Sequence, residues 1–68
     1  MDKQYVYDIR IEGILLDRWS DWFEGLTIQA GPNGETFLVG PLADQAALLG
    51  VLNKIHSLNL TLVSVIRR

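Results

Sequence analysis

Few side chains in this sequence of 68 residues are of the types that perform chemistry. His56 is the only histidine and there is no cysteine, which excludes a His/Cys metal cluster and a Cys-His nucleophilic pair. Ser57 adjoins His56, but neighbours on a helix point about 100° apart and do not form a Ser-His pair. We expect His56 to be a partly exposed surface residue, with contact to a ligand as the alternative.

The acidic residues offer a second possible site. Asp17 and Asp21 lie four residues apart, a spacing that suits acid–base work or a divalent ion. A simpler interpretation is that Asp17 caps a helix and Asp21 is solvated. Asp8, Arg10 and Glu12 lie at every second position and therefore on one side of a strand, which favours a solvent-exposed sheet surface over a polar binding surface. The sequence therefore predicts no catalytic residue, no cofactor and no metal, and an enzyme is the least favoured class.

Aromatic residues form the third candidate. Trp19, Trp22 and Phe23 have the i, i+3, i+4 spacing of one helical face, which predicts core packing. A short helix does not hide three large aromatics, so we expect one tryptophan, Trp19, to be partly exposed. Trp19 and Trp22 are the candidate contacts for an apolar or aromatic metabolite.

Apolar periodicity and turn residues divide the chain into six elements. Residues 5–12 alternate as a half-buried strand, and 18–24 form a short helix. Strands at 26–30 and 36–40 flank the turn Gly31-Pro32-Asn33-Gly34. A helix follows over 43–58, with Asp44 near its start, and residues 60–66 form a last strand. The expected core stripe of the long helix consists of Leu48, Val51, Leu52, Ile55 and Leu58.

The hairpin register decides which residues of the third strand face the core. A loop of two or four residues places Ile28, Phe37 and Val39 on one face, whereas a loop of three separates them. We therefore expect an even-length loop with Thr36 and Leu38 pointing outward. The outer face then lacks an aromatic on which RNA bases could stack.

These elements predict one α+β domain over residues 1–68. The order strand, helix, strand, strand, helix, strand is that of a ferredoxin-like βαββαβ fold, with a four-stranded antiparallel sheet in the spatial order 4-1-3-2. The connection at 13–25 is barely long enough for the first crossover. If it is a loop, the first three strands form a meander and the fourth lies parallel to the first.

Three stretches of the chain resemble a known group of sequences. Trp19–Ile28 (WSDWFEGLTI), the run from Gly40 that reads GPLADQAALLGVL, and residues 58–65 are similar to a widespread group of uncharacterised bacterial proteins of about 70 residues. Similar sequences often carry a histidine where Leu49 stands here, so no role of that histidine transfers to this chain. The resemblance supports the fold and implies no activity.

Net charge and hydropathy restrict the partners. The chain has a net charge of -2 and a pI of about 5.0, which argue against a general binder of nucleic acid or anionic membranes. No apolar run is long enough to span a membrane. Met1–Gln4 lacks the basic segment of a secretory signal, so we expect a cytoplasmic location.

Charges are distributed unevenly. Residues 25–66 contain only three charged side chains, Glu35, Asp44 and Lys54, where an average domain has roughly ten. The side of the long helix opposite its core stripe is small or uncharged: Ala46, Gly50, Asn53 and Ser57. These four residues are the candidate interface of a homo-oligomer, because burial against a copy supplements the core of so short a chain without disulfides.

The favoured function is a non-enzymatic interaction module, a dimer or larger homo-oligomer built through the charge-poor half. The partner is a second copy, with another protein as a further possibility. The alternative is a small-ligand sensor that binds near Trp19 and Trp22.

Overall fold

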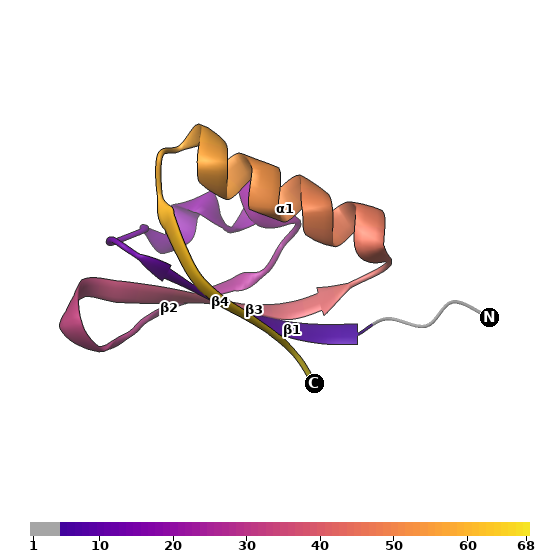
Figure 1. Cartoon of the computed structure of the whole chain (residues 1–68), viewed down its shortest axis with the longest axis horizontal. Coiled ribbons are helices and arrows are strands. Elements are labelled where there is room, and N and C mark those ends of the chain that lie inside the picture. The colour runs from indigo at the N-terminus through magenta and orange to yellow at the C-terminus, as the bar shows by residue number, and fades with distance from the viewer. Residues whose placement is uncertain (1–4) are drawn as a thin grey trace.

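A computed structural model describes residues 5–68, so Met1–Gln4, on which the expected lack of a secretory signal depends, lie outside the described residues. The elements are β1 (Tyr5–Glu12), the 3-10 helix η1 (Asp17–Phe23), β2 (Thr27–Ala30), the 3-10 turn η2 (Pro32–Gly34), β3 (Glu35–Leu42), α1 (Gln45–Ser57) and β4 (Thr61–Arg67). Figure 1 shows α1 and η1 on the same side of the sheet. The architecture is therefore α+β with two layers.

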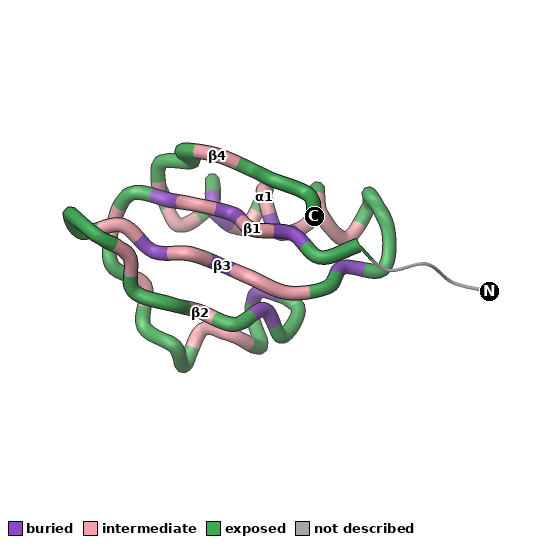
Figure 2. Tube along the Cα trace, turned by 90° about the horizontal axis from the view of Figure 1, so that it is seen from below, coloured by how far each residue is buried: buried purple, intermediate pink, exposed green. Residues whose placement is uncertain are grey.

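The sheet has the strand order β2-β3-β1-β4. β1 pairs antiparallel with both β3 and β4, and β2 pairs antiparallel with β3. This is the expected spatial order, and the antiparallel pairing of β4 with β1 excludes the alternative in which these strands run parallel. Figure 2 shows β4 at one edge of the sheet and β2 at the other.

The first crossover departs from the ferredoxin-like pattern, because α1 is the one α-helix within residues 5–68. η1 has three residues per turn, so Trp19 and Trp22 lie on one side of it, with ring centroids 6.4 Å apart. Asp17 was expected to cap this helix, but Leu16 occupies the N-cap position and makes no side-chain cap. A segment this short has little helical stability of its own, and packing of Phe23 into the core decides its shape.

The expected hairpin register is wrong. Ala30 lies opposite Thr36 and Ile28 opposite Leu38, and the Gly31 N–H donates to Glu35 O at 2.8 Å around a three-residue loop. Asn33 and Gly34 adopt the positive φ values that this loop requires. Thr36 and Leu38 are consequently buried, and the residues that were expected to face the core, Phe37 and Val39, lie on the outer face.

Thr36 is the buried polar residue that fixes this register. Its hydroxyl donates to Gly13 O at 2.7 Å and accepts from the Leu15 N–H at 3.2 Å. These bonds tie β3 to the segment between β1 and η1 and satisfy two backbone groups that have left the sheet.

Thr36→Val should lower the free energy of unfolding by about 1–3 kcal/mol, because two backbone groups lose their partner in a buried site. Urea unfolding followed by circular dichroism measures the change. Thr27→Val, on the exposed surface of β2, is the matched control and should change the value by less than about 0.5 kcal/mol. Equal effects of the two substitutions would contradict the assigned role of Thr36.

The long helix agrees with its expected pattern. Asp44 is its N-cap and accepts the Ala47 N–H at 2.8 Å, which satisfies one of the unpaired groups at the helix start. Val51 and Ile55 are buried against the sheet. The remaining residues of the expected stripe are partly buried and pack on the same core: Leu48, Leu52 and Leu58.

Candidate functional site

Both tryptophans are at least partly exposed. Trp19 is partly exposed, as expected, and packs against the core, but Trp22 is the more exposed member, at 45%. The Lys54 ammonium lies 5.0 Å from the Trp22 ring centroid and donates to Trp22 O at 2.9 Å. The exposed indole already has a cationic partner from α1.

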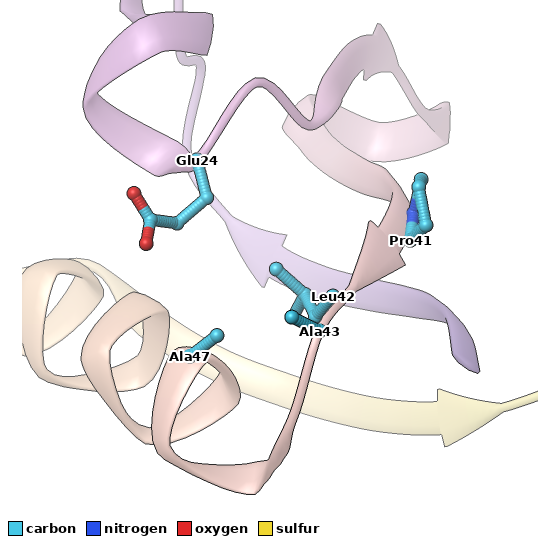
Figure 3. A pocket seen from close by; sticks show the side chains of 5 residues that line it. All are labelled: Glu24, Pro41, Leu42, Ala43 and Ala47. Carbon is cyan, nitrogen blue, oxygen red and sulfur yellow. The ribbon is translucent and has the colours of Figure 1, made fainter. Parts of the chain in front are cut away.

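An open cavity of about 400 Å³ lies between the end of η1, the end of β3 and the start of α1. Its lining residues are Glu24, Pro41, Leu42, Ala43 and Ala47 (Figure 3). The Glu24 carboxylate lies on the α1 side and is 4.0 Å from the Lys54 ammonium. Neither tryptophan lines the cavity, so the structure does not combine these two features into one aromatic ligand site.

The titratable candidates from the sequence lie on the surface: His56, Asp17 and Asp21 are all exposed. No three His, Cys, Asp or Glu side chains within residues 5–68 are grouped so that they could hold a metal ion.

The outer face of the sheet contains an aromatic residue that the sequence reasoning placed inside. Phe37 lies opposite Arg10, whose guanidinium carbon is 4.9 Å from the Phe37 ring centroid. Asp8, Glu12 and Glu35 share this face by their register with β3. The expectation of a face without aromatics is therefore wrong, but the ring is covered by Arg10 and lies among carboxylates that repel phosphates.

The candidate interface on α1 lies on the exterior of the helix. Ala46, Asn53 and Ser57 are exposed and Gly50 is partly exposed. Beyond the chain neighbours and the helix backbone, a Cβ at Gly50 would meet no atom within 4 Å. The four residues therefore lie on one open surface, and the structure does not test whether another subunit covers it.

β4 carries a second apolar surface. Four of its seven residues are large exposed hydrophobics: Leu62 44%, Val63 43%, Val65 37% and Ile66 56%. No charged residue occurs from Thr61 to Ile66. Edge strands are normally protected from association with other chains by charged residues, proline or short length, whereas β4 is exposed and apolar over most of its length.

One flank of α1 extends the β4 surface. Lys54 faces η1, because it contacts Trp22. At about 100° per residue, Leu49 and Leu52 lie about 140° and 160° from Lys54 and therefore on the flank toward β4. Leu49 is 52% exposed.

Sequence reasoning did not single out β4 as an interface, although both signals were present. The absence of charge from Thr61 to Ile66 is visible in the sequence, and the expected strand order 4-1-3-2 places this strand at an edge. An uncharged strand is ordinary in the centre of a sheet. β4 is a candidate interface because it lies at an edge, where β1 is its one neighbour in the sheet.

Comparison with known protein families gives a match over most of the chain. A family model whose description is "Domain of unknown function (DUF8691)" matches residues 6–66. No curated protein and no solved structure matches the chain. Within residues 5–68, no helix has the length and apolar character needed to cross a membrane.

Proposed function

Since the chain belongs to the DUF8691 family, whose description names no activity, we propose from its own surface that it is a non-enzymatic self-association module. It forms a homo-oligomer through its charge-poor half, residues 25–66. The observation that carries the proposal is the exposed edge strand β4, which has no charged residue from Thr61 to Ile66. Contiguous apolar surface of this kind marks interaction sites.

Each of the three charged side chains in residues 25–66 already has a partner within the chain. Glu35 lies 3.8 Å from the Arg10 Nε atom. Asp44 caps α1, and Lys54 contacts Trp22 and Glu24. The surface left between them is therefore apolar or uncharged.

Chain length adds a second argument. A domain of about 60 residues buries only about 60% of its unfolded surface and is correspondingly marginal. The chain has no cysteine for disulfides, and oligomerisation is the remaining common way to stabilise such a chain.

Purified protein should elute with a mass by light scattering of at least twice 7.7 kDa at micromolar concentration. Dilution should return the monomer, because association follows mass action. A constant monomer mass up to the highest soluble concentration would overturn the proposed function.

Two surfaces of the charge-poor half are open to a second subunit. One is the sequence-derived face of α1, and the other is the β4 edge. Gly50→Glu places a charge at the centre of the helix face, at a position where an added Cβ has open space. This variant loses the oligomer only if the helix face is the contact.

The alternative function, binding of an apolar or aromatic metabolite near Trp19 and Trp22, has less support. Lys54 occupies the exposed indole face, and the open cavity is lined by other residues. A cytoplasmic location and relatives among bacteria are further predictions, drawn from the composition and from the resemblance of the motifs.

A further inference from the structure

The free edge of β4 presents backbone groups that have no partner within the sheet. The Arg68 N–H donates to Val6 O at 2.8 Å. Antiparallel ladders alternate, so Ile66, two residues earlier, also directs its backbone groups to β1. The backbone groups of Val65 and Arg67, the residues on either side of Ile66, point away from the sheet. They are positioned to extend it by one further strand.

The two edges of the sheet differ in how they are protected. β2 has only four residues, and such short edge strands resist pairing with other chains. β4 has seven residues, and its one irregularity is a register shift against β1 between Arg10 and Ile11. This shift leaves Val63 without an opposite residue. Of the two edges, β4 is therefore the one open to pairing.

We propose that β4 of one copy pairs antiparallel with β4 of a second copy, so that two four-stranded sheets join into one sheet of eight strands. This inference rests on the proposed function, because it names the surface through which the chain self-associates. The partner is a second copy because β4 is complementary to itself. The complementarity concerns the face on which its side chains lie, the position of its charges and the packing of the adjacent helix α1.

Side-chain facing selects the register. Leu62 lies opposite Ile11 and Val65 opposite Ile9, so both side chains are on the helix side of the sheet. Directly opposite residues of an antiparallel pair share a face. In one register, residues that lie on the same face of the sheet are opposite each other in both copies. It places Leu62 of one copy opposite Val65 of the other, with Thr61 opposite Ile66 on the outer face.

Charge favours the antiparallel arrangement of the two β4 strands. In this arrangement, Arg67 and Arg68 of one copy lie at one end of the β4–β4 ladder and those of the other copy lie at the opposite end. Each pair then lies beside the start of the partner's β4, where Thr61 is paired with the exposed Glu12 of β1. A parallel pairing would place all four arginines together, which is destabilising.

The helices complete the interface. A two-fold axis normal to the sheet relates antiparallel strands and keeps both copies of α1 on the same face. The flanks of α1 that carry Leu49 and Leu52 then face each other across the axis, above Leu62 and Val65. Apolar side chains that are exposed in one copy are covered by the other.

Cysteine cross-linking tests the register without background, because the chain has no cysteine of its own. Leu62→Cys and Val65→Cys are prepared separately, mixed, allowed to exchange subunits and mildly oxidised. The mixture should give a disulfide-linked dimer on a non-reducing gel, because opposite residues meet the Cα distance of a disulfide. Either variant alone should give little, because identical positions in this register lie three residues out of line, beyond about 7 Å.

A charge on the edge tests the surface independently. Val65→Lys should raise the dimer Kd by about 100-fold or more, because edge lysines block strand pairing. Thr27→Lys on the opposite edge is the matched control and should change the Kd by less than about threefold, as expected of a surface substitution away from the contact. Circular dichroism confirms that both variants fold, and Gly50→Glu should remain dimeric.

The outcomes separate this inference from the proposed function. A dimer whose cysteine mixture does not cross-link, or cross-links no faster than the single variants, overturns the β4 pairing and leaves self-association intact. Loss of the dimer in Gly50→Glu but not in Val65→Lys assigns the interface to the helix face. A wild-type protein that stays monomeric overturns both.

Discussion

Leu38→Ala should lower the free energy of unfolding by about 2–5 kcal/mol, the range for removing a large aliphatic side chain from a packed core. Leu38 is fully buried, with 0% of its surface exposed, and it lies between Ile9 of β1 and Ile28 of β2 in the sheet. The surrounding strands prevent the site from collapsing around the smaller residue. Urea unfolding at a fixed protein concentration gives the value, since association shifts the apparent stability.

Val39→Ala is the control for the register. Val39 lies on the outer face and is only partly buried, so its truncation should cost about 1 kcal/mol or less, in line with the loss of one or two half-exposed methyl groups. A loop of two or four residues would reverse the order of the two variants. If Val39→Ala is the more destabilising, the three-residue hairpin is wrong.

The register of this hairpin shows where the sequence pattern is insufficient. Phe37, Leu38 and Val39 are consecutive and all apolar, so alternation does not distinguish the two faces of β3. The deciding contacts are long-range: the Thr36 hydroxyl bonds to Gly13 and Leu15. A threonine that satisfies backbone groups more than twenty residues away leaves no periodic signal.

α1 and β1 could be predicted because each has one polar and one apolar side. Tyr7, Ile9 and Ile11 alternate with charged residues, and all three are buried. In α1 the stripe centred on Val51 and Ile55 has the helical period, and Asp44 marks the start. Local pattern and tertiary packing agree in these two elements.

The sequence indicated the half of the chain that contains the candidate interface, but not the strand that forms it. Counting charges identified the half of the chain that is poor in ionised groups. It did not single out β4, because the charges were counted over the whole segment 25–66 and not strand by strand, although the expected order, which the structure confirms, places this strand at an edge. The helix face around Gly50 was visible from helical geometry alone and was therefore chosen first.

Phe23 makes a large contribution to the packing of the first crossover, the segment that contains η1. η1 lacks a side-chain N-cap, and its seven residues are too few for a helix that is stable by itself. Phe23 is its one buried residue, and the Leu26 N–H and Ser20 hydroxyl bonds close the turn that follows it. The layer that covers the β2–β3 side of the sheet is therefore anchored mainly through the Phe23 ring, with Trp19 packing partly against the same core.

Phe23→Ala should cost about 3–5 kcal/mol, the usual range for emptying a buried phenylalanine site. At roughly 0.05–0.15 kcal/mol per residue, the whole free energy of unfolding of a chain of this size is about 3–10 kcal/mol. We expect the variant to be largely unfolded or to melt at least about 12 °C lower, since about 1 kcal/mol shifts the Tm of a small domain by 4–8 °C. Thermal unfolding followed by far-UV circular dichroism measures the loss.

Trp22→Ala is the matched control, because it removes a larger ring from the adjacent position of η1. Trp22 is 45% exposed and contacts Lys54, so its loss should cost about 1 kcal/mol or less, the value of an exposed cation–π contact. Equal costs for the two variants would show that η1 is not anchored through Phe23. If the chain assembles as proposed, raising the protein concentration should partly restore folded Phe23→Ala, because the dimer binds only the native subunit. The Val65→Lys background should abolish that recovery, which links the stability of this small core to the β4 edge.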